Sequence, residues 1–243
     1  MSASSAGTVR WGRERARIGS WRGDRSVAFL APLPDAPVPS AEFLRRCLDT
    51  LVARGFSHVV TGALSPQEQA GFLAAGFSVE EELHLLSIDL DSLPAVSPGL
   101  RLARVSRRRR AGVLEIDSLA FPSFWQFDRF GLNAALRATP STRFRVALTS
   151  VPGSGRHRPV AYAICGRADT RGFVQRLAVH PAHQRHGTGR RLLVDGLRWM
   201  AAGGARRAVV NTQTSNEAAL SLYLDVGFRR EPVGLSVLSA GLA

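Results

Sequence analysis

The sequence predicts an α/β fold built from two related parts. Segments with the apolar pattern of strands alternate along the chain with amphipathic segments at helical spacing. Glycines and prolines separate these segments at short intervals, which is typical of turns between packed elements. A block that begins near residue 59 recurs near residue 209, and this repeat points to a tandem arrangement.

Length and composition place the chain among globular proteins. Its 243 residues, of which 45% are apolar and 21% charged, suffice for one large domain or two small ones. The two cysteines, Cys47 and Cys165, are too few for a disulfide framework, so we expect buried thiols in a reducing compartment. Apolar stretches are too short for a membrane span, and residues 1–7 lack the apolar core of a signal peptide. We therefore expect a cytoplasmic protein with no membrane partner.

The net charge of +13 is carried entirely by arginine, because the sequence contains no lysine. Such a charge fits an anionic partner, nucleic acid included. Arginine bias in a GC-rich genome explains the missing lysine better, because selection for charge alone would accept both residues. Nucleic acid is therefore the disfavoured partner, and the charge does not decide the function.

The first half of the chain predicts a series of alternating strands and helices. The arginine-rich segment 1–26 is expected to fray at its start, with a hairpin turning near Gly23. A half-domain is expected over 27–91, in which Ser40 and Ser65 cap the two helices. Its strands and helices are expected, in order, over 27–30, 40–55, 56–61, 65–76 and 77–90.

The second half is expected to start after a linker rich in proline and serine, residues 92–99. A single domain is expected to follow over 100–243. Its strands are expected over 100–105, 144–149, 159–166, 173–179, 208–211 and 228–238. Its helical segments are expected over 106–120, 121–138, 189–202 and 215–227. A plain hairpin turn is expected at 152–155, where proline, glycine and serine follow one another.

The internal repeat supports duplication of one ancestral unit. Both copies contain a Val-Val strand, a serine near a helix start and a Gly-Phe pair before the next strand. These blocks begin at Val59 and Val209 and end at Phe77 and Phe228. Chance could produce one Gly-Phe pair, but it accounts poorly for the whole order of elements. We therefore expect the N-terminal part to be a second copy of the C-terminal part.

The stretch from Arg176 to Leu193 carries the clearest chemical signal. A strand leads into a Gly-x-Gly turn at Gly187 and Gly189, and the turn opens an amphipathic helix. Glycines let a ligand approach the backbone, and the first helical turn offers unpaired N–H groups at the positive end of the dipole. Together these features favour a pyrophosphate cradle. The segment fits neither the dinucleotide fingerprint nor the P-loop.

Two motifs in this half resemble the GNAT acetyltransferases. Gln184-x-x-Gly187-x-Gly189 follows a strand that ends Leu-Ala-Val-His-Pro and is similar to the acyl-CoA motif of that family. The later block from Asn216 to Phe228, with Leu-Tyr before Gly-Phe, is similar to the family's next strand–helix segment. The resemblance covers roughly residues 98–243. It implies a mixed, largely antiparallel central sheet flanked by helices, in tandem with a truncated N-terminal lobe that lacks the CoA motif.

The resemblance also implies a set of acetyl-CoA-binding residues. In the family, the motif strand and the next strand splay apart around the pantetheine arm, and backbone groups pair with it. The cofactor-binding residues implied in this sequence are Leu177, Ala178, Val179, Gln184, Arg185, His186, Gly187, Thr188, Gly189, Arg190 and Asn216. Asn216 could equally be only a helix cap. Tyr223 falls where the family often places the acid that protonates the departing thiolate.

The general base is left open by the sequence. An alkylammonium acceptor has a pKa of about 10, so direct attack on a thioester requires that a proton be removed first. The family frequently places glutamate on the motif strand, where this chain has Gln175, which cannot accept the proton. Asp169, just before the strand, and a water chain are the possible substitutes. The missing carboxylate motivates an alternative function, a non-catalytic acyl-CoA-binding regulator or sensor.

The acceptor side is expected near an aromatic segment. Phe121, Phe124 and Trp125 lie where family members build the acceptor wall, although core packing would explain them as well. An amine acceptor is implied: a peptide or protein N-terminus, or a small-molecule amine such as an antibiotic. We expect no metal, because the histidines near the motif have no ligand partners at metal-binding spacing. A monomer or a homodimer is compatible with the sequence.

Overall fold

The computed structural model describes residues 7–33, 35–95, 99–151, 153 and 155–242. These residues group into two units by their contacts. The first unit contains the described residues up to Leu85, Thr212–Ser215, and those from Glu231 onward. The second unit contains the described residues of Leu86–Asn211 together with Asn216–Arg230. The chain therefore returns to the first unit at its end.

The first unit is a mixed sheet with two helices. Its strands follow the order β1-β2-β3-β4-β12-β5. Its elements are β1 (Gly7–Trp11), β2 (Glu14–Ser20), β3 (Val27–Pro32), α1 (Ala41–Ala53), β4 (His58–Leu64), α2 (Pro66–Ala74), the first part of β5 (Ser78–Asp89) and β12 (Leu235–Gly241). The β1–β2 and β2–β3 pairs are antiparallel, and β3–β4 is parallel. Apolar residues of α1, including Phe43, Leu44 and Leu51, pack into the core of this unit.

The helices of the first unit start as the sequence predicts. Ser40 caps α1, because its hydroxyl accepts a hydrogen bond from the Phe43 N–H at 3.2 Å. Ser65 and Glu68 form a capping box at the start of α2, with Pro66 in the first turn.

Cys47 is buried in this unit and Cys165 in the second, and both are free thiols.

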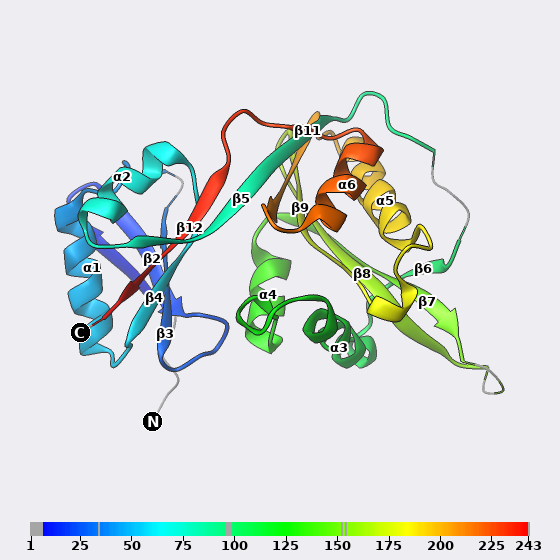
Figure 1. The fold of residues 1–243 in the computed structure, drawn as a ribbon, viewed down its shortest axis with the longest axis horizontal. Helices are drawn as coiled ribbons and strands as arrows, with labels where there is room; N and C mark the ends of the chain where they lie inside the picture. The colour runs from blue at the N-terminus through cyan, green and yellow to red at the C-terminus, as the bar shows by residue number, and fades with distance from the viewer. Residues whose placement is uncertain (1–6, 34, 96–98, 152, 154, 243) are drawn as a thin grey trace. The chain divides into compact units, whose positions relative to one another are not determined.

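The second unit is a sheet covered by helices on both faces. Its strands follow the order β5-β10-β9-β8-β7-β6, and β11 pairs with the other side of β5. Figure 1 shows α5 and α6 on one side of its strands, and α3 and α4 on the other. The elements are β6 (Arg101–Arg104), α3 (Arg110–Ala120), α4 (Arg129–Arg137), β7 (Ser141–Ser150), β8 (His157–Ala168), β9 (Arg171–Val179), α5 (Thr188–Ala202), β10 (Arg207–Gln213), α6 (Glu217–Val226) and β11 (Arg229–Arg230).

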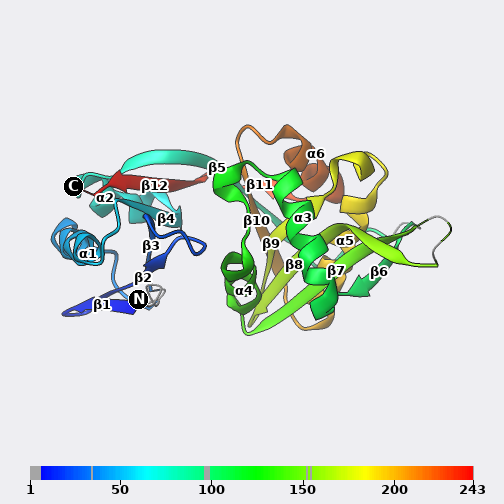
Figure 2. The ribbon, with the colours of Figure 1, turned by 90° about the horizontal axis from the view of Figure 1, so that it is seen from below.

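Two apolar clusters fill the second unit, one for each face of its sheet. Leu192, Leu193 and Leu197 of α5 belong to the first cluster. Val113 and Ile116 of α3 belong to the second, together with Tyr162 of β8. Short 3₁₀ turns at Arg107–Arg109, Ser123–Trp125 and Pro181–His183 connect the longer elements. Figure 2 shows β9, β8, β7 and β6 following one another across this unit.

The expected single strand over 228–238 is wrong, and so is its place in the second half. The chain forms the short β11, breaks at Glu231–Gly234, and continues as β12. β12 lies antiparallel between β4 and β5, so it completes the sheet of the first unit (Figure 1). The last part of β5 lies beside β10 in the second unit. The structure thus divides the chain at other points than the expected domains 27–91 and 100–243, because strand pairing over this separation leaves no local pattern.

The N-terminal segment contains the expected hairpin near Gly23, formed by β2 and β3, and a second hairpin before it. β1 and β2 pair around a turn that contains Gly12 with a φ of 57°, and the expected frayed start falls on residues 1–6, which lie outside the described residues. Ala16 and Ile18 are buried against α1 and anchor the hairpin. Their alternation with arginines was the signal for a strand. In the expected linker 92–99, residues 92–95 form no helix or strand, and 96–98 lie outside the described residues. Two residues of the expected turn at 152–155 also lie outside them.

The repeat seen in the sequence recurs in the structure. In the first unit a hairpin, β2–β3, is followed by α1 and by β4, which is parallel to β3. In the second unit the hairpin β8–β9 is followed by α5 and by β10, which is parallel to β9. The first unit has no counterpart of the α3 and α4 helices among its described residues. It is a truncated copy of the second unit.

No helix among the described residues is long and apolar enough to cross a membrane.

The Thr61 hydroxyl stabilises the irregular part of β12, and a substitution that removes this hydroxyl tests its contribution to stability. The register of β12 shifts around Leu238, whose N–H donates to the buried Thr61 hydroxyl at 2.9 Å. Thr61→Val leaves that N–H without its partner, so we expect a loss of about 1–3 kcal/mol in unfolding free energy. Urea unfolding measures the loss. Thr61→Ser keeps the hydroxyl and should recover most of the stability; an equal loss in both variants would contradict the hydrogen-bond explanation.

Candidate functional site

A cleft of about 380 Å³ opens in the second unit where β9 ends. It lies between the last residues of β9, the loop that leads into α5, and one side of α6. Residues from all three segments and from the end of α3 line it: Ala120, Phe121, Leu177, Ala178, Val179, His183, Gln184, Arg185, Gly187, Thr188, Gly189, Arg190, Asn216, Ala218, Ala219, Ser221, Leu222, Tyr223 and Asp225.

The cleft begins where β9 and β10 stop pairing. These parallel strands pair only at Arg171, Gly172 and Phe173 of β9. From Val174 to Val179, β9 pairs with β8 on its other side but not with β10 in the described register. The backbone groups of Leu177 and Val179 on that side have no strand partner and face a space that an extended ligand can enter. This arrangement fits a ligand that pairs with a strand edge.

The loop between β9 and α5 forms a cradle of backbone amides. The Gln184 amide donates to the Val179 carbonyl at 3.2 Å and ties the loop to the strand end. Arg185 and Gly187 both have positive φ values, 64° and 72°, which turn successive N–H groups toward one side. Gly187 is the helix N-cap and provides no side-chain acceptor for the first amides of α5.

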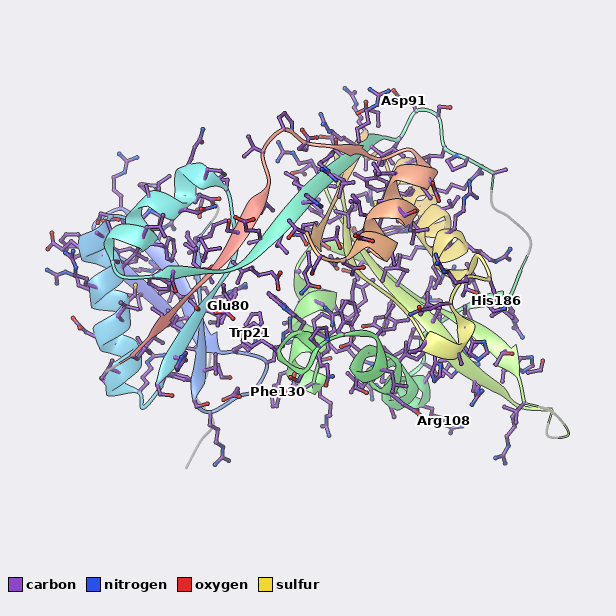
Figure 3. All side chains as sticks on the ribbon, in the orientation of Figure 1. Trp21, Glu80, Asp91, Arg108, Phe130 and His186 are labelled. Carbon is purple, nitrogen blue, oxygen red and sulfur yellow. The ribbon has the colours of Figure 1, made fainter. Side chains whose placement is uncertain are left out.

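The cradle is suited to bind an anion such as a phosphate group. The amides of the first turn lie at the positive end of the α5 dipole, where anions bind favourably. Arg185 and Arg190 line the same part of the cleft and add positive charge. A Cβ at Gly189 would come within 3.4 Å of Leu222 and Val179, so the backbone passes tightly there. Thr188 is buried at the start of the helix, whereas His186 is exposed on the loop (Figure 3) and does not line the cleft.

Two residues of α6 complete the cleft. Asn216 caps the helix, because its side-chain oxygen accepts from the Ala219 N–H at 3.1 Å, and it also lines the cleft. Tyr223 is 6% exposed and packs its ring 5.6 Å from the ring of Phe228. Burial raises the pKa of the Tyr223 hydroxyl above its ordinary value, so the group is protonated at neutral pH. A protonated hydroxyl in the cleft wall can donate a proton to a bound group.

The predicted acceptor residues do not all reach the cleft. Phe121, just after α3, lines it. Phe124 and Trp125 pack edge to face with ring centroids 5.1 Å apart, but neither lines the cleft.

Neither candidate for the general base lines the cleft. Asp169 is exposed in the β8–β9 turn with a φ of 47°, at the opposite end of β9 from Leu177. At the rise of a strand this is about 25 Å away. Gln175 lies at a register shift of β9; its amide nitrogen is 3.3 Å from the Thr139 hydroxyl, and its buried oxygen has no partner among the described residues. Of the described residues that line the cleft, one carries a carboxylate, Asp225.

A buried ion pair supports the cleft wall, and sequence reasoning missed it. Asp117 of α3 is 0% exposed and accepts from Arg176 of β9 through both oxygens, at 2.8 and 2.9 Å. It also accepts from the Tyr162 hydroxyl and from the Phe127 N–H. Burial raises the pKa of the Tyr162 hydroxyl, which therefore stays a donor. Four hydrogen bonds thus compensate the buried carboxylate.

Arg176 connects this ion pair to the aromatic segment. Its guanidinium lies between two rings, 3.4 Å from the centroid of Phe121 and 4.1 Å from that of Phe127. It also donates to the Trp125 carbonyl at 2.6 Å. Arg176 therefore fixes the ring of Phe121 that faces the cleft. In the sequence, the one indication of this contact was the position of Arg176, a charged residue next to the apolar end of the strand.

Among the residues that the structure describes, no group of three or more His, Cys, Asp or Glu side chains is placed to hold a metal ion.

Comparisons with known proteins bear on the family and the fold of this chain. A sequence model of the acetyltransferase (GNAT) family matches residues 110–228. A mycothiol acetyltransferase of Amycolatopsis mediterranei is 41% identical over 59 residues, which are 24% of this chain and 20% of that protein. The matched stretch thus spans only about a fifth of that relative's length.

Solved structures share the fold over nearly the whole chain. A tandem GNAT protein from the clavulanic acid biosynthesis pathway superposes with a TM-score of 0.70 at 14% identity, covering 99% of this chain and 84% of that one. A GCN5-related N-acetyltransferase from Kribbella flavida gives a TM-score of 0.65 at 16% identity, covering 97% and 89%. At these identities the likeness concerns the fold, and it includes the tandem arrangement.

Proposed function

We propose that this protein, in which residues 110–228 match the acetyltransferase (GNAT) family, transfers an acetyl group from acetyl-CoA to an amine. The observation that carries the proposal is the cleft at the end of β9. There, a strand edge without a strand partner leads directly into the backbone amides at the start of α5. An extended pantetheine arm and a pyrophosphate need these two features in this order.

In the proposed acetyl transfer, the residues of the cleft would have the following roles. Bound acetyl-CoA supplies an activated thioester. The amides of Gly187–Arg190 hold its phosphates, and backbone groups of Leu177–Val179 align the arm and donate to the carbonyl oxygen as it gains charge. Tyr223 keeps its proton at neutral pH and gives it to the departing sulfur. Positioning of the two reactants supplies much of the acceleration.

The acceptor is proposed to approach along the wall formed by Phe121. This wall is apolar, and Arg176 holds it rigid from behind. A peptide or protein N-terminus and a small-molecule amine both fit such a wall. The proton of the acceptor amine leaves by a route that does not use Gln175, because a carboxamide cannot accept it.

Gln175 also favours a second candidate function. A protein that binds acyl-CoA without transferring the acyl group needs the cradle and no base, and it would act as a sensor or regulator. The two functions differ in turnover, and they share cofactor binding.

Amine-dependent release of CoA separates them. We expect thiol release from acetyl-CoA in the presence of a panel of free-amine peptides and small primary amines. Tyr223→Phe removes only the hydroxyl, so turnover should fall about 100-fold while the affinity for acetyl-CoA is retained. Unchanged turnover in the variant would remove Tyr223 as the acid. Tight binding without turnover for every amine would support the sensor function instead.

A further inference from the structure

Three arginines converge beside α5, away from the cleft. Arg143 and Arg145 lie two residues apart on β7, and Arg104 of β6 is the direct cross-strand neighbour of Arg145. Leu102 and Ala147, which share the faces of Arg104 and Arg145, pack into the cluster beneath α5. All three arginines therefore lie on the α5 face of the sheet. β7 and β6 follow β9 and β8 in the strand order, so this place is separate from the end of β9.

Among the described residues, Asp195 of α5 is the carboxylate that pairs with this cluster. Arg143 takes both oxygens of Asp195 in a bidentate pair, each at 2.8 Å, and this bond raises the pKa of Arg143. The Nε of Arg145 is 3.9 Å from the nearer Asp195 oxygen, which is too long for a hydrogen bond. That Nε is buried and has no hydrogen-bond partner among the described residues.

The cluster is therefore short of negative charge. The side chains of Arg143 and Arg145 are only 22% and 25% exposed, so water screens their repulsion incompletely. Burial and the neighbouring charges of Arg143 and Arg104 lower the pKa of Arg145. This direction is consistent with too little negative charge around Arg145. Arg104, Arg143 and Arg145 carry three positive charges, and Asp195 is the one carboxylate among the described residues that pairs with this cluster, so two positive charges stay uncompensated.

We propose that Arg104, Arg143 and Arg145 form a second binding site, for an oxyanion of the phosphate class. Guanidinium groups match the geometry of phosphate oxygens and bind them through paired N–H donors. A phosphate between Arg104 and Arg145 would accept hydrogen bonds from their terminal guanidinium N–H groups and would balance the positive charge that Asp195 does not compensate. This inference depends on the second unit alone and is independent of acetyl transfer.

Thermal unfolding with inorganic phosphate tests the site. The Gly187→Glu variant is the background, since its added carboxylate keeps phosphate out of the amide cradle. Sodium chloride at equal ionic strength controls for screening. We expect phosphate at ten times its Kd to raise Tm by about 3–6 °C. O-Phosphoserine, tested in parallel, distinguishes a phosphate monoester from free phosphate as the preferred ligand.

Matched arginine variants locate the effect. Arg145→Gln and Arg104→Gln should each remove most of the rise in Tm. Arg101→Gln should keep it, because Arg101 is an exposed arginine on the same strand as Arg104 but on the opposite face. In the wild-type chain, the Nε–H resonance of Arg145 should shift on titration with phosphate. Equal rises with chloride, equal rises in all variants, or an unmoved Arg145 resonance would each overturn the proposal.

Discussion

Asp117→Asn is expected to lower the free energy of unfolding by about 3–5 kcal/mol, the usual cost of removing one partner from a buried ion pair. The Arg176 side chain is only 10% exposed, so its charge would remain in the interior without a counter-charge. Asparagine has nearly the same shape, but it offers one acceptor oxygen where aspartate offers two. Chemical denaturation followed by circular dichroism measures the loss.

A surface pair provides the matched control for this change. Asp35 pairs with Arg15 at 2.8 Å, but the Asp35 side chain is 73% exposed. Asp35→Asn removes the same charge by the same substitution, and we expect a cost of at most about 1 kcal/mol. Similar costs for the two variants would show that the burial of Asp117 has no special energetic role. The Asp117 variant should also lose order in the segment 121–127, visible as faster amide exchange there.

Gly187→Glu is expected to weaken acetyl-CoA binding by about 100-fold to 1000-fold. A glutamate at the helix N-cap places a carboxylate among the amides proposed to hold the pyrophosphate, and like charges brought together cost several kcal/mol. The φ of 72° adds strain for any residue other than glycine. Isothermal titration calorimetry with acetyl-CoA and with CoA measures both affinities.

Gly204→Glu is the matched control for this variant. Gly204 follows the other end of α5 and has a φ of 91°, and a Cβ added there, like one added at Gly187, would meet no atom within 4 Å. The substitution therefore imposes the same charge and a similar backbone strain far from the cradle. We expect acetyl-CoA affinity to stay within about two-fold of the wild type. A comparable loss in both variants would attribute the effect of Gly187→Glu to stability.

The conformation of the loop between β9 and α5 could be predicted because its determinants are local. Gly187, Gly189 and Gln184 lie within six residues of one another, and the turn, the helix start and the tie to the strand depend on those residues. The helix caps Ser40, Ser65 and Asn216 were predictable for the same reason. In each case a side chain acts on backbone a few residues away, so the pattern is visible in the sequence.

Hydrogen bonds between residues far apart along the chain could not be predicted, including the ion pair beside the cleft wall. Arg176 and Asp117 are 59 residues apart, and Leu238 and Thr61 are 177 apart. Neither pair leaves a periodic signal. Asp169 was considered as a base because it lies close to Gln175 in the sequence. The structure places it in the β8–β9 turn, at the end of β9 that is remote from the cleft.

The position of β12 sets an order of events during synthesis. Every other strand of the first unit's sheet is made before residue 90, but β12, which lies between β4 and β5, comes from residues 235–241. On the ribosome, domains usually fold as they emerge, starting at the N-terminus. Here the nascent N-terminal segment exposes the unpaired edge of β4 until residues 235–241 have been made. Such an edge is a template for wrong pairing, so chaperone binding to β4 in the nascent chain is the expected protection.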